Sequence, residues 1–204
     1  MKVGLVPAAG LGTRLGLDTP KELVEYRGKP IIEYSLDNLI ASGMDRIVVV
    51  IRSEKEAVRD FLLKKYPARD FTFVYQTGVI GNLLDAIKAA SEHIRGHNVY
   101  FCMADTHIQP NPFEFEQDAS AEITLLCFEV DDDRWKHFGV LDLARRRLVD
   151  KPSEYVGNVC WGALVWQPKF TERLLHADLL PAAINAADWD YRVNIKSYTD
   201  IGVA

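Results

Sequence analysis

The chain has 204 residues, of which 48% are hydrophobic and 26% are charged, and its formal net charge is -5. This composition is typical of a globular protein, and mild acidity argues against a nucleic-acid partner, which requires a basic surface. No apolar run approaches the ~18 residues of a membrane span, and no secretory leader pattern is recognisable. We therefore expect a cytoplasmic protein without a membrane or nucleic-acid partner.

Strand and helix patterns alternate in the first half of the chain. Apolar runs predict strands at Lys2–Pro7, Arg46–Ile51, Phe71–Tyr75 and Asn98–Ala104. Helical periodicity predicts helices at Pro30–Ala41, from Ser53 to about Tyr66, and at Asn82–Arg95; a capping box at Ser53–Glu56 opens the second. This alternation predicts an α/β fold with a mainly parallel mixed sheet and helices on both faces.

The second half is richer in strands. Strands are predicted at Ile123–Val130, Phe138–Leu143, Val159–Trp166 and Val193–Tyr198, and a helix at Lys169–His176. No linker, internal repeat or low-complexity segment divides the chain. We therefore expect a single domain over residues 1–204.

A glycine-rich segment, Gly10-Leu-Gly12-Thr-Arg14, follows the first predicted strand. Ligands of parallel sheets bind at the carboxyl ends of the strands, where the loops after Pro7, Tyr75 and Ala104 are expected. Glycines let backbone N–H groups approach phosphate oxygens, although the spacing fits neither a dinucleotide fingerprint nor a Walker A loop. Alone, the segment is equally compatible with a structural turn.

Two nearby cations favour the phosphate-binding interpretation of this segment over the structural turn. Arg14 follows the glycines, and Lys21 comes seven residues later. A guanidinium fork and a flexible ammonium suit a triphosphate whose charge must be neutralised. The alternative is that both are solvated basic residues.

The N-terminal motifs resemble the signature of the sugar-1-phosphate nucleotidyltransferase family. The resemblance lies in Pro7–Gly16, Thr19–Leu23 and Gly28–Ile32, with Leu39–Val50 matching the usual second helix and strand. The short gap from Arg14 to Lys21 is similar to that of bacterial N-acetylglucosamine-1-phosphate uridylyltransferases and methylerythritol-phosphate cytidylyltransferases. The likeness extends more loosely to Asp200.

This resemblance implies a nucleotide-binding half at residues 1–110 and an acceptor-binding half at 111–204. Arg14 would hold the departing pyrophosphate, and Lys21 would bind the reacting phosphates. The implied nucleotide-binding residues are Ala8, Ala9, Gly10, Gly12 and Thr13 at the phosphates, with Gln76 and Gly81 at the base. The expected triphosphate is UTP, dTTP or CTP.

Asp105 ends an apolar strand, where a carboxylate must be solvated, paired or bound to a metal. Its oxygens suit Mg²⁺, which keeps several waters and takes few carboxylates. The resemblance makes Asp105 and Asp200 the two metal ligands, with Mg²⁺ as cofactor. His107 is an alternative ligand in an Asp-x-His arrangement, but a loop histidine is the favoured interpretation.

Asp150-Lys151-Pro resembles the family's Glu-Lys-Pro motif, in which the acid binds sugar hydroxyls and the lysine binds the sugar phosphate. Gly139 and Gly162 occupy places where the family lets the sugar lie against the backbone, and both are equally compatible with strand glycines at bulges. Trp161 is either a ring-stacking residue or part of the core.

The expected reaction joins a nucleoside triphosphate to a sugar 1-phosphate and releases pyrophosphate. Three alternatives stay open: another acceptor, such as phosphocholine, methylerythritol phosphate or a molybdenum-cofactor precursor; a GT-A-type glycosyltransferase; and a non-catalytic nucleotide-binding module. A homo-oligomer is compatible with the sequence, which does not determine the oligomeric state.

Overall fold

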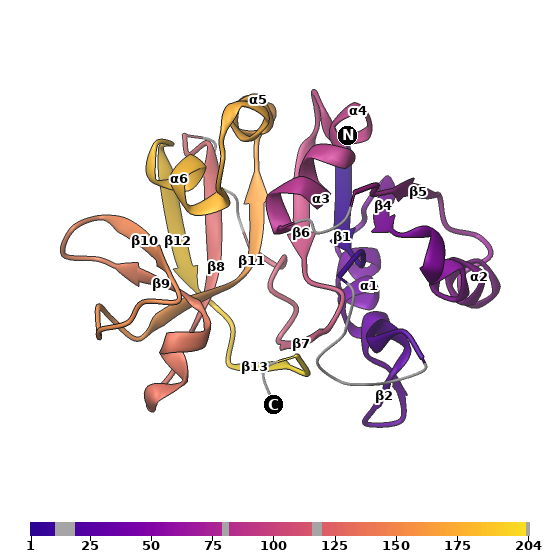
Figure 1. Ribbon diagram of the computed structural model, residues 1–204, viewed down its shortest axis with the longest axis horizontal. Coiled ribbons are helices and arrows are strands. Elements are labelled where there is room, and N and C mark those ends of the chain that lie inside the picture. Colours follow the sequence, from indigo (N-terminus) through magenta and orange to yellow (C-terminus); the bar gives the residue numbers. More distant parts are fainter. Residues whose placement is uncertain (11–18, 79–81, 116–119, 203–204) are drawn as a thin grey trace.

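The computed structural model describes residues 1–10, 19–78, 82–115 and 120–202, and these form a mixed sheet with helices on both faces (Figure 1). Within these ranges the main sheet has nine strands, in the order β10-β9-β11-β6-β1-β4-β5, with β8 paired to β11 and β12 paired to β8. Its strands are β1 (Lys2–Pro7), β4 (Arg46–Ile51), β5 (Phe71–Tyr75), β6 (Asn98–Cys102), β8 (Ile123–Glu129), β9 (Gly139–Asp142), β10 (Arg147–Asp150), β11 (Val159–Trp166) and β12 (Trp189–Val193).

The first half of the chain contributes the parallel part of this sheet. Strands β6, β1, β4 and β5 run parallel to one another, whereas β11 is antiparallel to β6, β8 and β9. The carboxyl ends of the four parallel strands therefore share one edge, which confirms the expected placement of the loops that follow β1, β5 and β6.

Helices cover both faces of the main sheet. One face carries α1 (Ile31–Ala41) and α2 (Glu56–Lys65); the other carries α3 (Leu83–Ala89), α4 (Ser91–Ile94), α5 (Pro168–His176) and α6 (Leu180–Asn185). Alternation along β1 explains this, because Val3 and Leu5 join the core under α3 whereas Val6 joins the core under α1. The predicted fold class is thus confirmed. In the described part of the chain, no helix has the length and apolarity needed to span a bilayer.

Two small antiparallel pairs lie outside the main sheet. β2 (Glu25–Tyr26) pairs with β3 (Lys29–Pro30), and β7 (Thr106–Gln109) pairs with β13 (Ser197–Asp200). The short 3-10 helices are η2 (Lys21–Leu23), η3 (Ser53–Lys55) and η4 (Asp133–His137). The β7–β13 pair matters most, because it brings the C-terminal part of the chain beside the end of β6 (Figure 1).

The predicted strand Val193–Tyr198 is wrong, because the chain changes sheets within it. β12 ends at Val193 alongside β8, and β13 begins four residues later alongside β7. Between them, the N–H of Ile195 donates to the carbonyl of Cys127 at 3.0 Å, and the N–H of Lys196 donates to the carbonyl of Gln109 at 2.9 Å. These bonds hold the crossing segment to both sheets.

Two helix predictions also need correction. The predicted helix Asn82–Arg95 is interrupted at Ala90, which separates α3 from α4. Ser53 does not cap α2, since it begins the 3-10 turn η3, whose last residue, Lys55, is buried. The capping box is found instead at Asn82, whose Oδ1 accepts from the N–H of Asp85 at 3.0 Å, while the N–H of Asn82 donates to Oδ2 of Asp85 at 2.9 Å.

Gly162 lies at the register shift between β11 and β8, where a methyl group has no room. A Cβ there would be 2.9 Å from the ring of Tyr198 and 3.0 Å from Cδ1 of Ile195. Overpacking a core costs about 1–3 kcal/mol, so we expect Gly162→Ala to lower the free energy of unfolding by that amount in urea titrations. An unchanged urea midpoint would show that the Tyr198 ring moves away from the added methyl group without a loss of stability.

Candidate active site

A cavity of about 150 Å³ opens at the carboxyl edge of the parallel strands. The loops after β1, β5 and β6 line it together with η2. Its lining residues are Pro7, Ala9, Gly10, Lys21, Glu22, Gln76, Asn82, Leu83, Ala86, Met103 and Asp105. The structure therefore brings Ala9, Gly10, Lys21, Gln76 and Asp105, which the sequence singles out from four separate segments, to one place.

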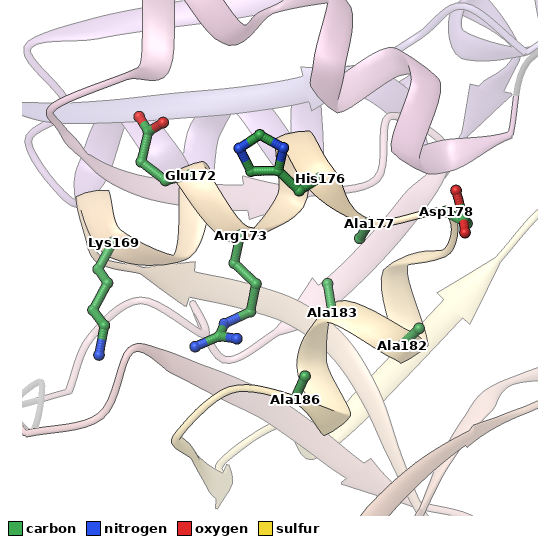
Figure 2. Close-up of a pocket in the computed structure, with 9 residues that line it drawn as sticks. All are labelled: Lys169, Glu172, Arg173, His176, Ala177, Asp178, Ala182, Ala183 and Ala186. Atoms are coloured by element: carbon green, nitrogen blue, oxygen red, sulfur yellow. The ribbon is translucent and has the colours of Figure 1, made fainter.

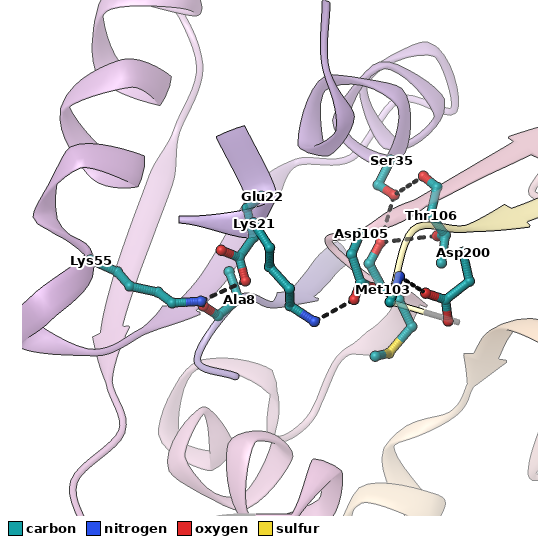
Figure 3. A network of polar contacts seen from close by, with 10 residues as sticks. Ala8, Lys21, Glu22, Ser35, Lys55, Met103, Asp105, Thr106 and Asp200 are labelled. Atoms are coloured by element: carbon teal, nitrogen blue, oxygen red, sulfur yellow. Dashed lines mark hydrogen bonds and ion pairs between the residues drawn. The ribbon is translucent and has the colours of Figure 1, made fainter. Parts of the chain in front are cut away.

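Asp105 is held in a tight turn directly after β6. Ser35 of α1 donates its hydroxyl to the carbonyl of Met103 at 2.6 Å, and the hydroxyl of Thr106 donates to the same carbonyl at 3.2 Å (Figure 3). Asp105 is only 4% exposed, and its Oδ1 has no hydrogen-bond partner among the residues that the structure describes. A buried carboxylate oxygen without a partner is costly, and a cation ligand would relieve that cost.

The β7–β13 pair brings Asp200 to Asp105. Asp200 lies opposite Thr106 in this pair, and the N–H of Ile201 donates to the carbonyl of Asp105 at 3.2 Å. A Cβ placed on Gly202 would lie 3.1 Å from Oδ1 of Asp200 and 3.5 Å from Oδ2 of Asp105. Both carboxylates therefore border the same small space beside Gly202.

This proximity changes the titration of Asp200. Burial, followed by the negative charge of Asp105, raises the pKa of Asp200 to about 6. Within the described residues, no cluster of three or more His, Cys, Asp or Glu side chains is arranged to hold a metal. A metal at this point would have two protein carboxylates, and Mg²⁺ characteristically completes such a set with waters and substrate oxygens.

Lys21 connects the acidic pair to the glycine segment. Its ammonium forms an ion pair with Oδ2 of Asp105, and a Cβ on Gly10 would lie 3.8 Å from the Lys21 nitrogen. Burial opposes the charged form of Lys21, but Asp105 outweighs this and raises the pKa of Lys21 above its ordinary value. Lys21 is thus a permanent cation between the start of the glycine segment and Asp105.

The other predicted nucleotide-binding residues do not all line the first cavity. Ala8 lies behind the cavity, where its N–H donates to the carbonyl of Val50 at 2.7 Å and its carbonyl accepts from Lys55 at 2.9 Å. Gln76 lines the cavity and is 8% exposed. The predictions for Gly12, Thr13, Arg14 and Gly81 fall outside the described residues.

A second cavity, of about 140 Å³, shares Asn82 and Leu83 with the first. Its lining is Asn82, Leu83, Leu84, Leu148, Asp150, Trp161, Leu179, Leu180 and Pro181. The predicted acceptor residue Asp150 and the side chain of Trp161 thus line the same space, which adjoins the first cavity. Lys151 lines neither cavity, and its positive charge offsets part of the burial and of the Asp105 charge that together raise the pKa of Asp200.

Gly139 and Gly162 do not line either cavity. A Cβ on Gly139 would lie 2.2 Å from Nε1 of Trp161, so this glycine makes room for the indole that forms a wall of the second cavity. Gly162 makes room for Tyr198, two residues before Asp200. Both glycines therefore act on the cavities through packing.

His107 and a larger cavity lie apart from this chemistry. His107 is 3% exposed, and its ring lies 4.3 Å from that of Tyr34 and 5.6 Å from that of Tyr26. A cavity of about 590 Å³ lies between α5 and α6 and contains none of the predicted site residues (Figure 2). Lys169 and Arg173, which line it, pair with the buried Glu122.

Three buried charged residues near the first cavity have no role in the sequence-based site. Glu22 is fully buried and forms a 2.6 Å ion pair with Lys55, and Arg52 is 8% exposed. Arg52 directly follows the apolar strand β4, at the same sheet edge as Asp105. The rule that singles out Asp105, a charge at the end of a buried strand, also identifies Arg52.

The sequence profile of the MobA-like NTP transferase domain matches residues 4–177, and the chain belongs to that family. It is 30% identical over 198 residues to a mannose-1-phosphate guanyltransferase of Yarrowia lipolytica, a match that covers 89% of this chain and 53% of that protein. The chain thus spans about half the length of that relative.

Two further similarities agree with the predicted resemblance. A UTP–glucose-1-phosphate uridylyltransferase of Haloferax volcanii is 28% identical over 196 residues, covering 91% of this chain and 79% of that protein. A solved structure from Bacillus anthracis, assigned as a glucose-1-phosphate thymidylyltransferase, superposes with a TM-score of 0.88 at 17% identity, covering 99% of this chain and 90% of that one. The latter match confirms the fold.

The raised pKa of Asp200 predicts a site that destabilises the metal-free fold. Above pH 6 the folded protein holds Asp200 ionised against burial and Asp105, whereas unfolding restores its ordinary pKa. We therefore expect Asp200→Asn to raise the metal-free Tm by a few degrees at about pH 8, and the gain to disappear towards about pH 4, where both proteins are neutral at this position.

Differential scanning calorimetry in a chelator measures this difference. Asp178→Asn, an exposed substitution outside both cavities, is the matched control and should leave the Tm unchanged at either pH. A lower Tm for Asp200→Asn at about pH 8 would contradict the proposed charge repulsion.

Proposed function

We propose that the chain is a sugar-1-phosphate nucleotidylyltransferase, which joins a nucleoside triphosphate to a sugar 1-phosphate and releases pyrophosphate. The observation that carries this proposal is the meeting of Lys21, Asp105 and Asp200 beside a cavity lined by the start of the glycine segment. Family membership supports it, as do relatives named for guanylyl transfer to mannose 1-phosphate and uridylyl transfer to glucose 1-phosphate.

In the proposed reaction, a phosphate oxygen of the acceptor attacks the α-phosphorus of the triphosphate. A new P–O bond forms, and the bond from the α-phosphorus to the oxygen bridging to the β-phosphorus breaks, so pyrophosphate leaves with that electron pair. The acceptor phosphate is already mostly dianionic at neutral pH, so no general base is required. Catalysis consists mainly of positioning the two anions and neutralising their charge.

The two cations Lys21 and Arg14 and the glycine segment have distinct proposed roles. Lys21 aligns the reacting phosphates, and Arg14 stabilises the departing pyrophosphate. The remaining proposed nucleotide residues are Ala8, Ala9, Gly10, Gly12 and Thr13 around the triphosphate, and Gln76 and Gly81 at the base. The cavity lining by Ala9, Gly10, Lys21 and Gln76 supports this assignment for those four residues.

The acidic pair fits a divalent cation. Asp105 has a buried oxygen without a partner, and Asp200 is close enough for the two charges to disfavour each other. Asp105 and Asp200 would hold Mg²⁺, and the bound ion would neutralise charge on the α-phosphate. The ion pair between Lys21 and Asp105 holds the Lys21 ammonium next to this acidic pair.

The second cavity is the proposed acceptor site. Because both residues line this cavity, Asp150 is the proposed acceptor of hydrogen bonds from sugar hydroxyls, and Trp161 is proposed to pack against the sugar ring. Lys151, the residue after Asp150, is the proposed ligand of the acceptor phosphate. Gly139 makes room for Trp161, which lines this cavity, whereas Gly162 makes room for Tyr198, two residues before Asp200. A carboxylate beside an indole also suits a quaternary ammonium, which favours phosphocholine as the second candidate acceptor.

The base and the biological setting are less constrained. The sequence favours UTP, dTTP or CTP, and the guanyltransferase relatives add GTP to these. We further propose one domain with residues 1–110 binding the nucleotide and 111–204 the acceptor, a cytoplasmic location, and no nucleic-acid or membrane partner. A homo-oligomer is compatible with this assignment.

The experiment that tests the function measures pyrophosphate release with Mg²⁺. UTP, dTTP, CTP and GTP are each combined with a panel of sugar 1-phosphates, phosphocholine and methylerythritol phosphate. We expect one triphosphate to give acceptor-dependent pyrophosphate and a matching nucleotide-sugar. Release of free nucleotide from a nucleotide-sugar, without pyrophosphate in any combination, would instead indicate the glycosyltransferase alternative.

Lys21→Met and Asp105→Asn test the charges at the centre of the site. We expect each to lower kcat at least ~100-fold, because each removes one preorganised charge from the reacting phosphates or their metal. Circular dichroism and thermal melting should show that both variants remain folded. Turnover within about tenfold of the wild type in either variant would refute the role given to that residue.

Asp150→Asn tests the acceptor cavity. We expect the KM for the acceptor to rise about tenfold, since a charged hydrogen bond is weakened, while the KM for the triphosphate stays the same. Glu154→Gln is the matched control, because Glu154 is exposed and lies outside the cavity lining. Equal changes in both KM values would place Asp150 outside the acceptor site.

A further inference from the structure

Two cations are buried directly behind the nucleotide cavity. Arg52 and Lys55 come from the segment that follows β4, and they are 8% and 6% exposed. Neither lines the cavity, so neither side chain is placed to contact a triphosphate directly. Because a buried charge is costly unless it is paired, the partners of these residues explain why they are there.

Arg52 joins the two loops that form opposite sides of the nucleotide cavity. Its Nε donates to the carbonyl of Ala9 at 2.9 Å, and its Nη1 donates to the carbonyl of Gly78 at 2.7 Å. Ala9 directly precedes the glycine segment, and Gly78 follows Gln76 in the loop after β5. One rigid guanidinium therefore sets the distance between the start of the glycine segment and the loop that carries Gln76, the proposed contact of the base.

Lys55 likewise links the end of β1 to η2, the turn that carries Lys21. Its ammonium donates to the carbonyl of Ala8 at 2.9 Å and to Oε1 of Glu22 at 2.6 Å (Figure 3). Glu22 is completely buried and is the neighbour of Lys21 in η2. The ion pair thus fixes η2, and with it the backbone of Lys21, to the end of β1.

Positive and negative charges alternate from Lys55 through Glu22 and Lys21 to Asp105. Lys55 pairs with Glu22, and Lys21 pairs with Asp105 (Figure 3). Burial raises the pKa of Glu22 and lowers that of Lys55, and the ion pair opposes both changes. A buried pair of this kind adds little stability compared with apolar residues of the same volume, so its geometry is the more informative property.

We propose that Arg52 and Lys55 are positioning residues for the triphosphate, acting through the carbonyls of Ala8, Ala9 and Gly78 and through Glu22. This inference rests on the proposed nucleotidylyltransferase function, and it assigns a role to the segment after β4 that the sequence motifs do not include. Through these bonds, the two cations hold the donor side of the site without contacting the acceptor cavity.

Arg52→Lys and Lys55→Met test the proposal with the triphosphate and acceptor that support turnover. Lysine in place of Arg52 keeps the charge but cannot bridge two carbonyls with a planar fork. We expect each substitution to raise the KM for the triphosphate at least about tenfold, with the KM for the acceptor changed less than about twofold. Lys64→Met, an exposed substitution on α2, is the control and should change neither KM.

Lys55→Met leaves Glu22 buried without its partner, and this variant alone could fail to fold. The double variant Glu22→Gln/Lys55→Met removes both charges and should melt higher than Lys55→Met. We expect the double variant to keep the raised KM for the triphosphate, because the bond to the Ala8 carbonyl is still missing. A wild-type KM for the triphosphate in a folded double variant would overturn the role of Lys55.

Equilibrium binding separates this inference from the proposed function. If wild-type protein binds none of UTP, dTTP, CTP or GTP with Mg²⁺ in isothermal titration calorimetry, the function itself fails. If the wild type binds and turns over a triphosphate while Arg52→Lys and the double variant match Lys64→Met in affinity, only the positioning role is refuted.

Discussion

The close approach of Asp105 and Asp200 is the constraint on which the rest of this structure depends. Asp105 is buried and Asp200 is half-buried beside Gly202, and burial together with the negative charge of Asp105 raises the pKa of Asp200, so that its ionised form is held at a cost. The pairing of β13 with β7 holds them together despite it. The fold therefore maintains a concentration of negative charge that is favourable only beside a cation, and Lys21 supplies one of the required charges.

The remaining architecture keeps that arrangement rigid. The parallel strands end at one edge, so the loops carrying Gly10, Gln76 and Asp105 meet there. Ser35 of α1 fixes the turn that presents Asp105, and the absence of a side chain at Gly162 lets Tyr198 seat the strand that ends at Asp200. Core packing and catalytic geometry are consequently linked, since the same contacts stabilise the sheet and hold the proposed metal ligands.

The sequence predicted the first half of the fold well because local patterns determine it. The apolar strand before Asp105 and the motifs from Pro7 to Ile32 identified most of the nucleotide cavity. The strand predicted at Val193–Tyr198 was wrong, because the crossing from one sheet to another depends on partners distant in the sequence. The sequence pattern places Lys55 inside a capping box, since only the tertiary fold shows that Lys55 meets Glu22.

The central claim is that both carboxylates bind one divalent ion together with the triphosphate. The most direct measurement is pulsed electron paramagnetic resonance of Mn²⁺, substituted for Mg²⁺, bound with the triphosphate to protein labelled with carbon-13 at its aspartate carboxyls. Carbon-13 couplings from two carboxylates in the wild type, and from one in each of Asp105→Asn and Asp200→Asn, are the predicted result. Couplings unchanged in either variant, or absent from the wild type, would contradict the account.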